Sequence, residues 1–229
     1  DIIPCTYQYM HHGTNILVTG LLEFLNTTFP EFRVLPKADK WIFIRNYQKV
    51  FHCIDAGLRC LRRFGNGSYR IFGTYTTSLS AEFVDHYFSD CPNPRNTAAA
   101  ASTFRASVTG SIPAMQKRVY LLDPSEHEYL ALIGLAFWTV ENLDLSDRIL
   151  DLAARSRAAI MAELVTHIKD TFGAEKAAAR LGSLLCILQE FRRVVMDLKV
   201  EYEIYRLLDV FDDNTLMYKL QMDQSNEFS

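Results

Sequence analysis

The sequence predicts an all-α domain whose helices stack in roughly three layers, with one small β-hairpin. Apolar side chains recur every three or four residues through most of the 229-residue chain. The run from Tyr129 to Val140 is apolar nearly all round, which is typical of a helix buried in a middle layer. Residues 69–77 form the one stretch whose aromatic and β-branched content favours strands. We therefore expect a single domain over residues 1–229, an antiparallel helical sandwich.

The first two long helices are bounded by prolines. Apolar positions predict a helix from about Tyr7 to Phe29, which Pro30 should end because proline cannot continue a helix without strain. A second helix should begin after Pro36 and run to about Arg63.

The pattern then changes. Phe64 to Ser68 is a turn cluster, and Tyr69 to Thr77 predicts the hairpin. A loop at Cys91–Pro94 should lead into an alanine-rich helix that begins near Thr97.

The middle of the chain carries strong helix-start signals. Asp123, Pro124 and Glu126 predict a helix with Asp123 as the N-cap, and that helix should run to about Asn142. Ser146 should cap the next helix, which should stop at Gly173.

The last long helix has the most regular spacing of apolar residues. Its seam begins at Leu181, Leu184, Leu188 and Phe191 and continues to Leu208 at intervals close to a heptad repeat. Such a seam can pack in the core of the domain or form a dimer interface. It can also do the first along one part of the helix and the second along another. A short amphipathic segment, Asn214 to Gln221, follows it.

Composition excludes several classes of function. The net charge of −3 and a pI near 6.1 disfavour a grip on nucleic acid by phosphate neutralisation. The five cysteines include no CxxC pair, so we expect neither a zinc site nor a disulfide framework, and no cofactor. The sequence contains no phosphate-binding glycine loop, no G-x-S-x-G and no HExxH motif, so we do not expect an enzyme. The Tyr129–Val140 run is also too short to span a bilayer.

Three segments, in the expected order, resemble nuclear-receptor ligand-binding domains. The first resembles the family signature at Pro30, Phe32, Leu35, Asp39 and Arg45, although Lys40 stands where the signature has glutamine and Phe43 and Ile44 stand where it has leucines. Arg180-Leu181-Gly182 followed by Leu184-Leu185 looks like the start of the family's tenth helix. The segment from Leu208 to Leu220 resembles the junction before the family's terminal helix. The likeness is greatest to divergent nematode receptors derived from a hepatocyte-nuclear-factor-4-like ancestor.

The resemblance implies a ligand-regulated transcription factor of the nucleus. Its expected ligand is a small apolar molecule, a fatty acid or a sterol-like compound. It also implies a coregulator bound at the terminal helix, a homodimer or heterodimer, and a zinc-finger DNA-binding domain upstream, which this chain does not contain. The alternative is a ligandless helical interaction module whose pocket is filled by its own side chains.

Arg59 is the sharpest of the implied ligand-binding residues. By register from Asp39 it matches the arginine with which retinoid-X and hepatocyte-nuclear-factor-4 receptors hold a ligand carboxylate. A plain salt bridge with Asp55, one turn earlier, is the competing interpretation, and Arg62 and Arg63 compete for the role.

The other expected pocket residues come from three helices, and for each of them ordinary core packing is the competing interpretation. They are His11, Thr14, Asn15, Val18 and Leu22 on the first helix, Gln48, His52 and Ala56 on the second, and Leu198, Glu201 and Tyr202 on the last. We expect no metal at His11-His12, because adjacent helical residues point about 100° apart. Glu201 is awkward in a pocket unless it is paired, and the alternative is that it faces solvent.

The resemblance also assigns a coregulator groove, a dimer interface and a structural ion pair. The groove residues are Thr27, Arg45, Leu216, Met217, Tyr218 and Leu220. Thr27 stands where the family has a clamp lysine, and Tyr218, followed by Lys219, stands where it has a clamp glutamate, so we expect weak recruitment of LxxLL helices. The dimer interface would use Leu181, Leu184, Leu188 and Phe191. Glu128 should pair with Arg180.

Overall fold

The computed structural model describes residues 2–65, 70–140 and 143–221, and it is 78% helical. The turn residues 66–69 and the expected helix end at Asn142 lie outside the described residues. Within them, no helix is long and apolar enough to cross a membrane.

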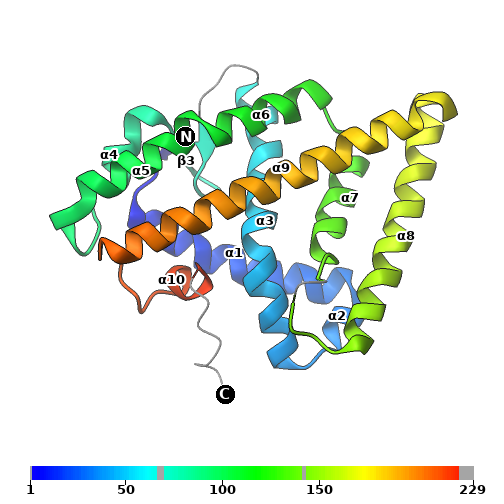
Figure 1. The fold of residues 1–229 in the computed structure, drawn as a ribbon, viewed down its shortest axis with the longest axis horizontal. Coiled ribbons are helices and arrows are strands. Elements are labelled where there is room, and N and C mark those ends of the chain that lie inside the picture. The colour runs from blue at the N-terminus through cyan, green and yellow to red at the C-terminus, as the bar shows by residue number, and fades with distance from the viewer. Residues whose placement is uncertain (1, 66–69, 141–142, 222–229) are drawn as a thin grey trace.

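Long helices dominate the molecule (Figure 1). The elements in chain order are β1 (Ile3–Pro4), α1 (Tyr7–Thr28), α2 (Pro30–Arg33), α3 (Lys37–Phe64), β2 (Ile71–Phe72), β3 (Thr77–Leu79), a 3-10 turn (Ala81–Phe83), α4 (Val84–Tyr87), a second 3-10 turn (Pro94–Asn96), α5 (Thr97–Thr109), α6 (Ser111–Leu122), α7 (Glu126–Phe137), α8 (Asp147–Phe172), α9 (Ala174–Leu207) and α10 (Leu216–Gln221).

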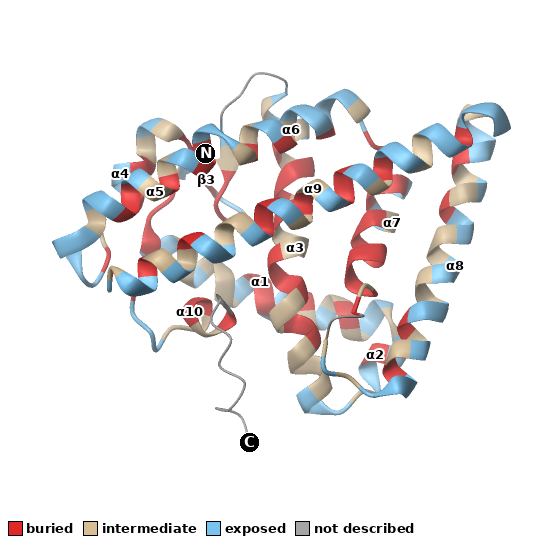
Figure 2. Cartoon of the chain, in the orientation of Figure 1, coloured by how far each residue is buried: buried red, intermediate tan, exposed pale blue. Residues whose placement is uncertain are grey.

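The helices form the predicted layers. α3 packs against α1 on one side and against α6 and α9 on the other, while α7 packs against α3, α8 and α9. α7 is mostly buried and α3 is mostly buried or half-buried, whereas α8 and α9 keep exposed outward faces (Figure 2). The burial of α7 is incomplete because Leu130 remains 55% exposed, and the helix ends at Phe137, short of the predicted end.

The start of α7 differs from the prediction in its capping. Ser125, not Asp123, is the N-cap: its hydroxyl accepts a hydrogen bond from the Glu128 backbone, and the Glu128 carboxylate accepts one from the Ser125 backbone at 2.7 Å. Asp123 instead ends α6 in the left-handed conformation, with φ of 46°. Two possible N-caps, Asp123 and Ser125, lie within three residues. Ser125 forms the N-cap because its capping box satisfies two backbone N–H groups at once.

The predicted hairpin is present as the antiparallel pair β2 and β3, and β1 adds a parallel strand on the other side of β3. β1 has only two residues, too few to produce a periodic pattern in the sequence. The sheet lies close to α1, because a Cβ on Gly13 would fall 2.3 Å from the Thr74 methyl group. This close approach fixes the distance between the sheet and the first helix.

Candidate ligand-binding site

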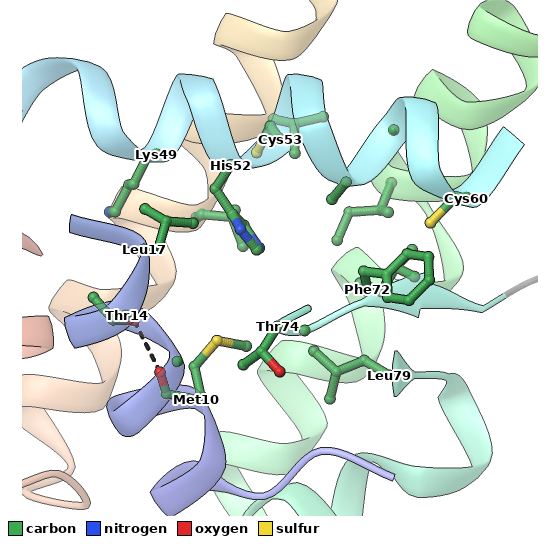
Figure 3. Close-up of a pocket in the computed structure, with 18 of the residues that line it drawn as sticks. Met10, Thr14, Leu17, Lys49, His52, Cys53, Cys60, Phe72, Thr74 and Leu79 are labelled. Atoms are coloured by element: carbon green, nitrogen blue, oxygen red, sulfur yellow. Dashed lines mark hydrogen bonds between the residues drawn. The ribbon is translucent and has the colours of Figure 1, made fainter. Parts of the chain in front are cut away.

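A cavity of about 140 Å³ lies where the hydrophobic clusters of the domain meet. Its lining comes from α1, α3, the β2–β3 segment, α9 and Met217 of α10, among other elements. Most of this lining is apolar, with Leu17, Phe72 and Leu79 around the space in Figure 3.

Four polar side chains on α3 also line the cavity. Gln48, Lys49, His52 and Arg59 each carry a buried nitrogen that makes no hydrogen bond within the described part of the chain. Buried polar groups in folded proteins nearly always have partners, and leaving one unpaired costs about 1–3 kcal/mol. Their gathering on one helix face makes this the polar side of an otherwise apolar cavity.

Arg59 is largely engaged by the protein itself. Its Nε donates to Asp55 Oδ2 at 2.8 Å, its Nη2 lies 2.8 Å from the same oxygen as an ion pair, and its Nη1 donates to the Thr74 carbonyl at 3.3 Å. The guanidinium also lies over the rings of Phe72 and Tyr75, at 4.4 and 5.0 Å from their centroids. The salt bridge with Asp55, which was the competing interpretation of Arg59, is therefore present. Arg59 also lines the cavity.

Lys49 is in a different situation. The residue is 8% exposed, and its ammonium lies 4.8 Å from the centroid of the Tyr202 ring. Burial, helped by the charge of Lys199, lowers the pKa of Lys49 to about 7. The amine of Lys49 is therefore only partly protonated at neutral pH.

Glu201 is buried beside the cavity rather than facing solvent. Its carboxylate accepts hydrogen bonds from the hydroxyls of Ser107 and Tyr205, the latter at 3.0 Å. Burial raises the pKa of Glu201 even though these hydrogen bonds oppose the shift. Pairing thus explains how a carboxylate is tolerated here.

His52 is neutral in this environment. Burial, together with the positive charge of Arg59, lowers the pKa of His52 to about 4. A neutral imidazole offers one donor and one acceptor nitrogen, so His52 can hydrogen-bond a ligand without bringing a charge.

The cavity gathers only part of the predicted lining. Arg59, Thr14, Gln48, His52, Ala56, Leu198, Glu201 and Tyr202 line it. The remaining four, all on α1, do not: they are His11, Asn15, Val18 and Leu22.

The prediction placed the cavity-facing side of α1 about one residue too far along the helix. The lining residues on α1 are Met10, Gly13, Thr14 and Leu17, each one before a predicted residue or shared with the set. One residue corresponds to about 100° of rotation, so Val18 and Leu22 pack in the main core instead. The sequence alone gives α1 a broad apolar surface without a unique inner face.

Lys49 is the most consequential residue that the prediction missed. It lies three positions before His52, so the helical spacing places these two side chains one turn apart on the same face of α3. Lysine is rarely fully buried, so the sequence did not predict Lys49 among the pocket residues.

Comparison with known proteins identifies the family. The model of the ligand-binding domain of nuclear hormone receptors matches residues 4–208 of this chain. The chain belongs to that family. It is also 19% identical, over 217 residues, to Nuclear hormone receptor family member nhr-28 of Caenorhabditis briggsae. That alignment covers 91% of this chain and 48% of the relative, so the chain spans about half the relative's length.

Membership accounts for the architecture and for the kind of site. Nuclear-receptor ligand-binding domains are not enzymes, and the helical fold with its small sheet agrees with the family. The family as a whole works through ligands and coregulators and typically acts in the nucleus.

Four of the predicted coregulator residues lie on α10, which packs on α1, while Thr27 and Arg45 lie on α1 and α3. Thr27 is exposed near the end of α1, and Arg45 is partly buried on α3. On α10, Met217, Tyr218 and Leu220 are buried and Leu216 is partly buried. Tyr218 is thus committed to the interior, while Lys219 is partly exposed beside it.

The structure places the residues of the predicted dimer seam inside this chain. Leu184, Leu188 and Phe191 are buried in the core of this same chain, and Leu181 packs against that core. The heptad-like seam belongs to a helix that α3, α6, α7 and α8 cover. A regular apolar repeat identifies a buried stripe but not the element that buries it.

Glu128 and Arg180 form the predicted structural pair, in a bidentate arrangement with two contacts of 2.7 Å. Arg180 also donates to the carbonyls of Leu122 and Asp123, so it joins α9 to the α6–α7 connection. Burial would raise the pKa of the Glu128 carboxyl, but hydrogen bonds from Arg180 and the Ser125 backbone hold it below its usual value.

Proposed function

We propose that this chain is the sensor domain of a nuclear receptor transcription factor and binds a small amphipathic molecule in the cavity between α1, α3 and α9. The observation that carries the proposal is the set of unpartnered polar nitrogens on α3, at Gln48, Lys49 and His52, in the lining of an apolar cavity among the described residues. A ligand with hydrogen-bond acceptors would satisfy them and remove the cost of leaving them unpaired.

A second function is favoured by the size of the cavity. About 140 Å³ is close to the volume that accommodates benzene and is below the range of roughly 300–1,000 Å³ usual for drug-sized ligands. A domain that binds no ligand and acts through its surfaces alone is therefore the competing function. Small fatty acids fit this volume better than sterols do.

Native mass spectrometry of the purified domain, followed by denaturing extraction, tests the proposal. We expect a co-purifying small molecule that is released on denaturation. Ala56→Phe is the matched control, because Ala56 lines the cavity and the larger side chain would fill it. A ligand-free wild-type mass, unchanged by added amphipathic compounds, would favour the competing function.

For partners, we infer that coregulator helices bind weakly at the α1–α10 surface, because neither end of the usual charge clamp is present in the sequence. We also infer that any dimer built on α9 uses its outward face, where Met196 and Val200 are 58% and 60% exposed. DNA binding and nuclear action are proposed for the whole receptor, through a zinc-finger domain outside this chain.

A further inference from the structure

We propose that Lys49, rather than Arg59, binds the acidic group of the ligand, and that the ligand is a small amphipathic carboxylate. This inference rests on the proposed function and names the ligand class and the residue that selects it.

The first step is that the charge of Arg59 is already neutralised and that its Nε and Nη1 groups already donate hydrogen bonds. Asp55 neutralises it, the Thr74 carbonyl accepts from it, and the rings of Phe72 and Tyr75 cover it. A ligand carboxylate at Arg59 would have to displace Asp55 or share the guanidinium with it. Displacement would leave the Asp55 carboxylate without its partner.

The second step is that Lys49 has no such partner. Within the described residues its ammonium forms no hydrogen bond and no ion pair. The acidic group that acts on Lys49, Glu201, accepts hydrogen bonds from Ser107 and Tyr205 instead. In its protonated form, Lys49 therefore offers three unused N–H donors and a positive charge in a mostly apolar enclosure.

The third step is that two neutral polar side chains of the same helix, Gln48 and His52, also line the cavity. Lys49 and His52 project from the same side of α3 toward α1 in Figure 3. The Gln48 amide nitrogen and one His52 nitrogen also lack partners in the described part of the chain. The Lys49 ammonium and the His52 imidazole, one helical turn apart, can together hold both oxygens of a carboxylate, and the charge-assisted contact from Lys49 is the stronger of the two.

The fourth step concerns the rest of the ligand. Beyond this polar side, the cavity is lined by Leu17, Phe72, Leu79 and other apolar residues, which suit a hydrocarbon body. The volume of about 140 Å³ limits that body to a short chain or a single ring. A neutral ligand of the same size would leave the charge of Lys49 unpaired.

The test compares octanoate with 1-octanol, which differ only at the head group, by calorimetric titration of the intact domain. We expect the wild type to bind octanoate more tightly, and Lys49→Met to weaken octanoate roughly ten- to a hundredfold while leaving 1-octanol nearly unchanged. Lys37→Met is the matched control, because Lys37 is exposed on the same helix. Lys49→Arg should restore part of the preference for octanoate.

A double variant, Asp55→Asn with Arg59→Gln, tests the rival anchor without leaving a lone charge, and we expect it to retain octanoate binding. Loss of octanoate binding in this double variant, with retention in Lys49→Met, would assign the anchor to Arg59 and overturn the proposal. Equal weakening of both compounds by Lys49→Met would mean that Lys49 only packs, which also overturns it. Failure of the wild type to bind either compound would contradict the proposed function as well.

Discussion

The Lys49 ammonium lies in an unfavourable environment in the ligand-free domain, and this has a measurable consequence. Its pKa falls from an ordinary lysine value of 10.5 in the unfolded chain to about 7 in the folded one. Between these two values the unfolded chain binds more protons, so this residue makes stability rise with pH. Below about pH 7 both states are protonated and the full cost of burying the charge remains. The groups that act on Lys49 are Lys199, which lowers its pKa, and Cys53 and Glu201, which raise it.

We therefore predict that Lys49→Met stabilises the ligand-free domain at pH 6 by about 1–3 kcal/mol, because it removes a buried charge without a partner. The gain should shrink as the pH approaches the ordinary lysine pKa. Urea unfolding at about pH 6, 7.5 and 9 measures both effects, with Lys37→Met as the exposed control. A gain that is constant with pH would contradict the titration of Lys49.

Gly13 determines how closely the sheet approaches α1. A Cβ at this position would lie 2.3 Å from the Thr74 methyl group, and the Thr74 hydroxyl is held by Thr77 at 2.7 Å. Thr74 therefore cannot turn away freely. A Cβ added to Gly20, on the same helix, would meet no neighbouring side chain of the described residues within 4 Å.

We predict opposite effects of the same substitution at these two glycines. Gly13→Ala should destabilise the domain by roughly 1–3 kcal/mol because Thr74 must be displaced. Gly20→Ala should stabilise it by up to about 1 kcal/mol through helix propensity alone. Thermal and urea unfolding of both variants checks this. If Gly13→Ala were as stable as Gly20→Ala, the close approach of the sheet to α1 would be wrong.

At the scale of elements, the two faces of α9 lie in different environments. Its inner seam, including Leu184 and Leu188, lies in the domain core. Its outer face carries Met196 and Val200 in solvent. The Arg180–Glu128 pair then joins the start of this helix to α7.

We predict that Leu188→Ala lowers the free energy of unfolding by about 2–5 kcal/mol, as expected for a buried leucine, without changing the oligomeric state. Val200→Glu should leave stability within about 0.5 kcal/mol and should weaken any dimer formed through α9. Urea unfolding and analytical ultracentrifugation separate these outcomes. Dissociation of a dimer by Leu188→Ala in a still-folded domain would restore the seam as an interface.

At the scale of the whole molecule, the ligand cavity and the proposed coregulator surface are connected through α10. Met217 lines the cavity, while the same short helix packs against α1. A ligand that contacts Met217 would thus stabilise α10 in this position. Thr27, on the exposed end of α1, lies outside the cavity and can be altered without touching the ligand.

We predict that Thr27→Lys strengthens binding of an LxxLL peptide about two- to fivefold, because the added charge complements the carboxyl end of the peptide helix. Thr19→Lys, also exposed on α1, is the matched control for added charge. Fluorescence anisotropy with a labelled peptide measures the change. An equal gain in both variants would indicate nonspecific attraction to a positive charge.

The sequence by itself determined the helical class, the layers and most element boundaries. Those features follow from local rules: Pro30 and Gly173 end or separate helices, and apolar spacing marks buried stripes such as Leu184–Leu188. Through the resemblance to the family, it also placed the Glu128–Arg180 pair and about half of the cavity residues on α3 and α9.

Only the tertiary structure decided which element packs against each apolar helix face. Contacts between residues distant in sequence decide three features. They decide which face of α1 lines the cavity and that the α9 seam is buried. They also leave Lys49 without a partner among the described residues. A buried stripe looks the same in sequence whether its own chain, a second copy or a ligand covers it. Only the arrangement of the covering elements distinguishes these cases, and here it left a buried ammonium in the wall of a cavity.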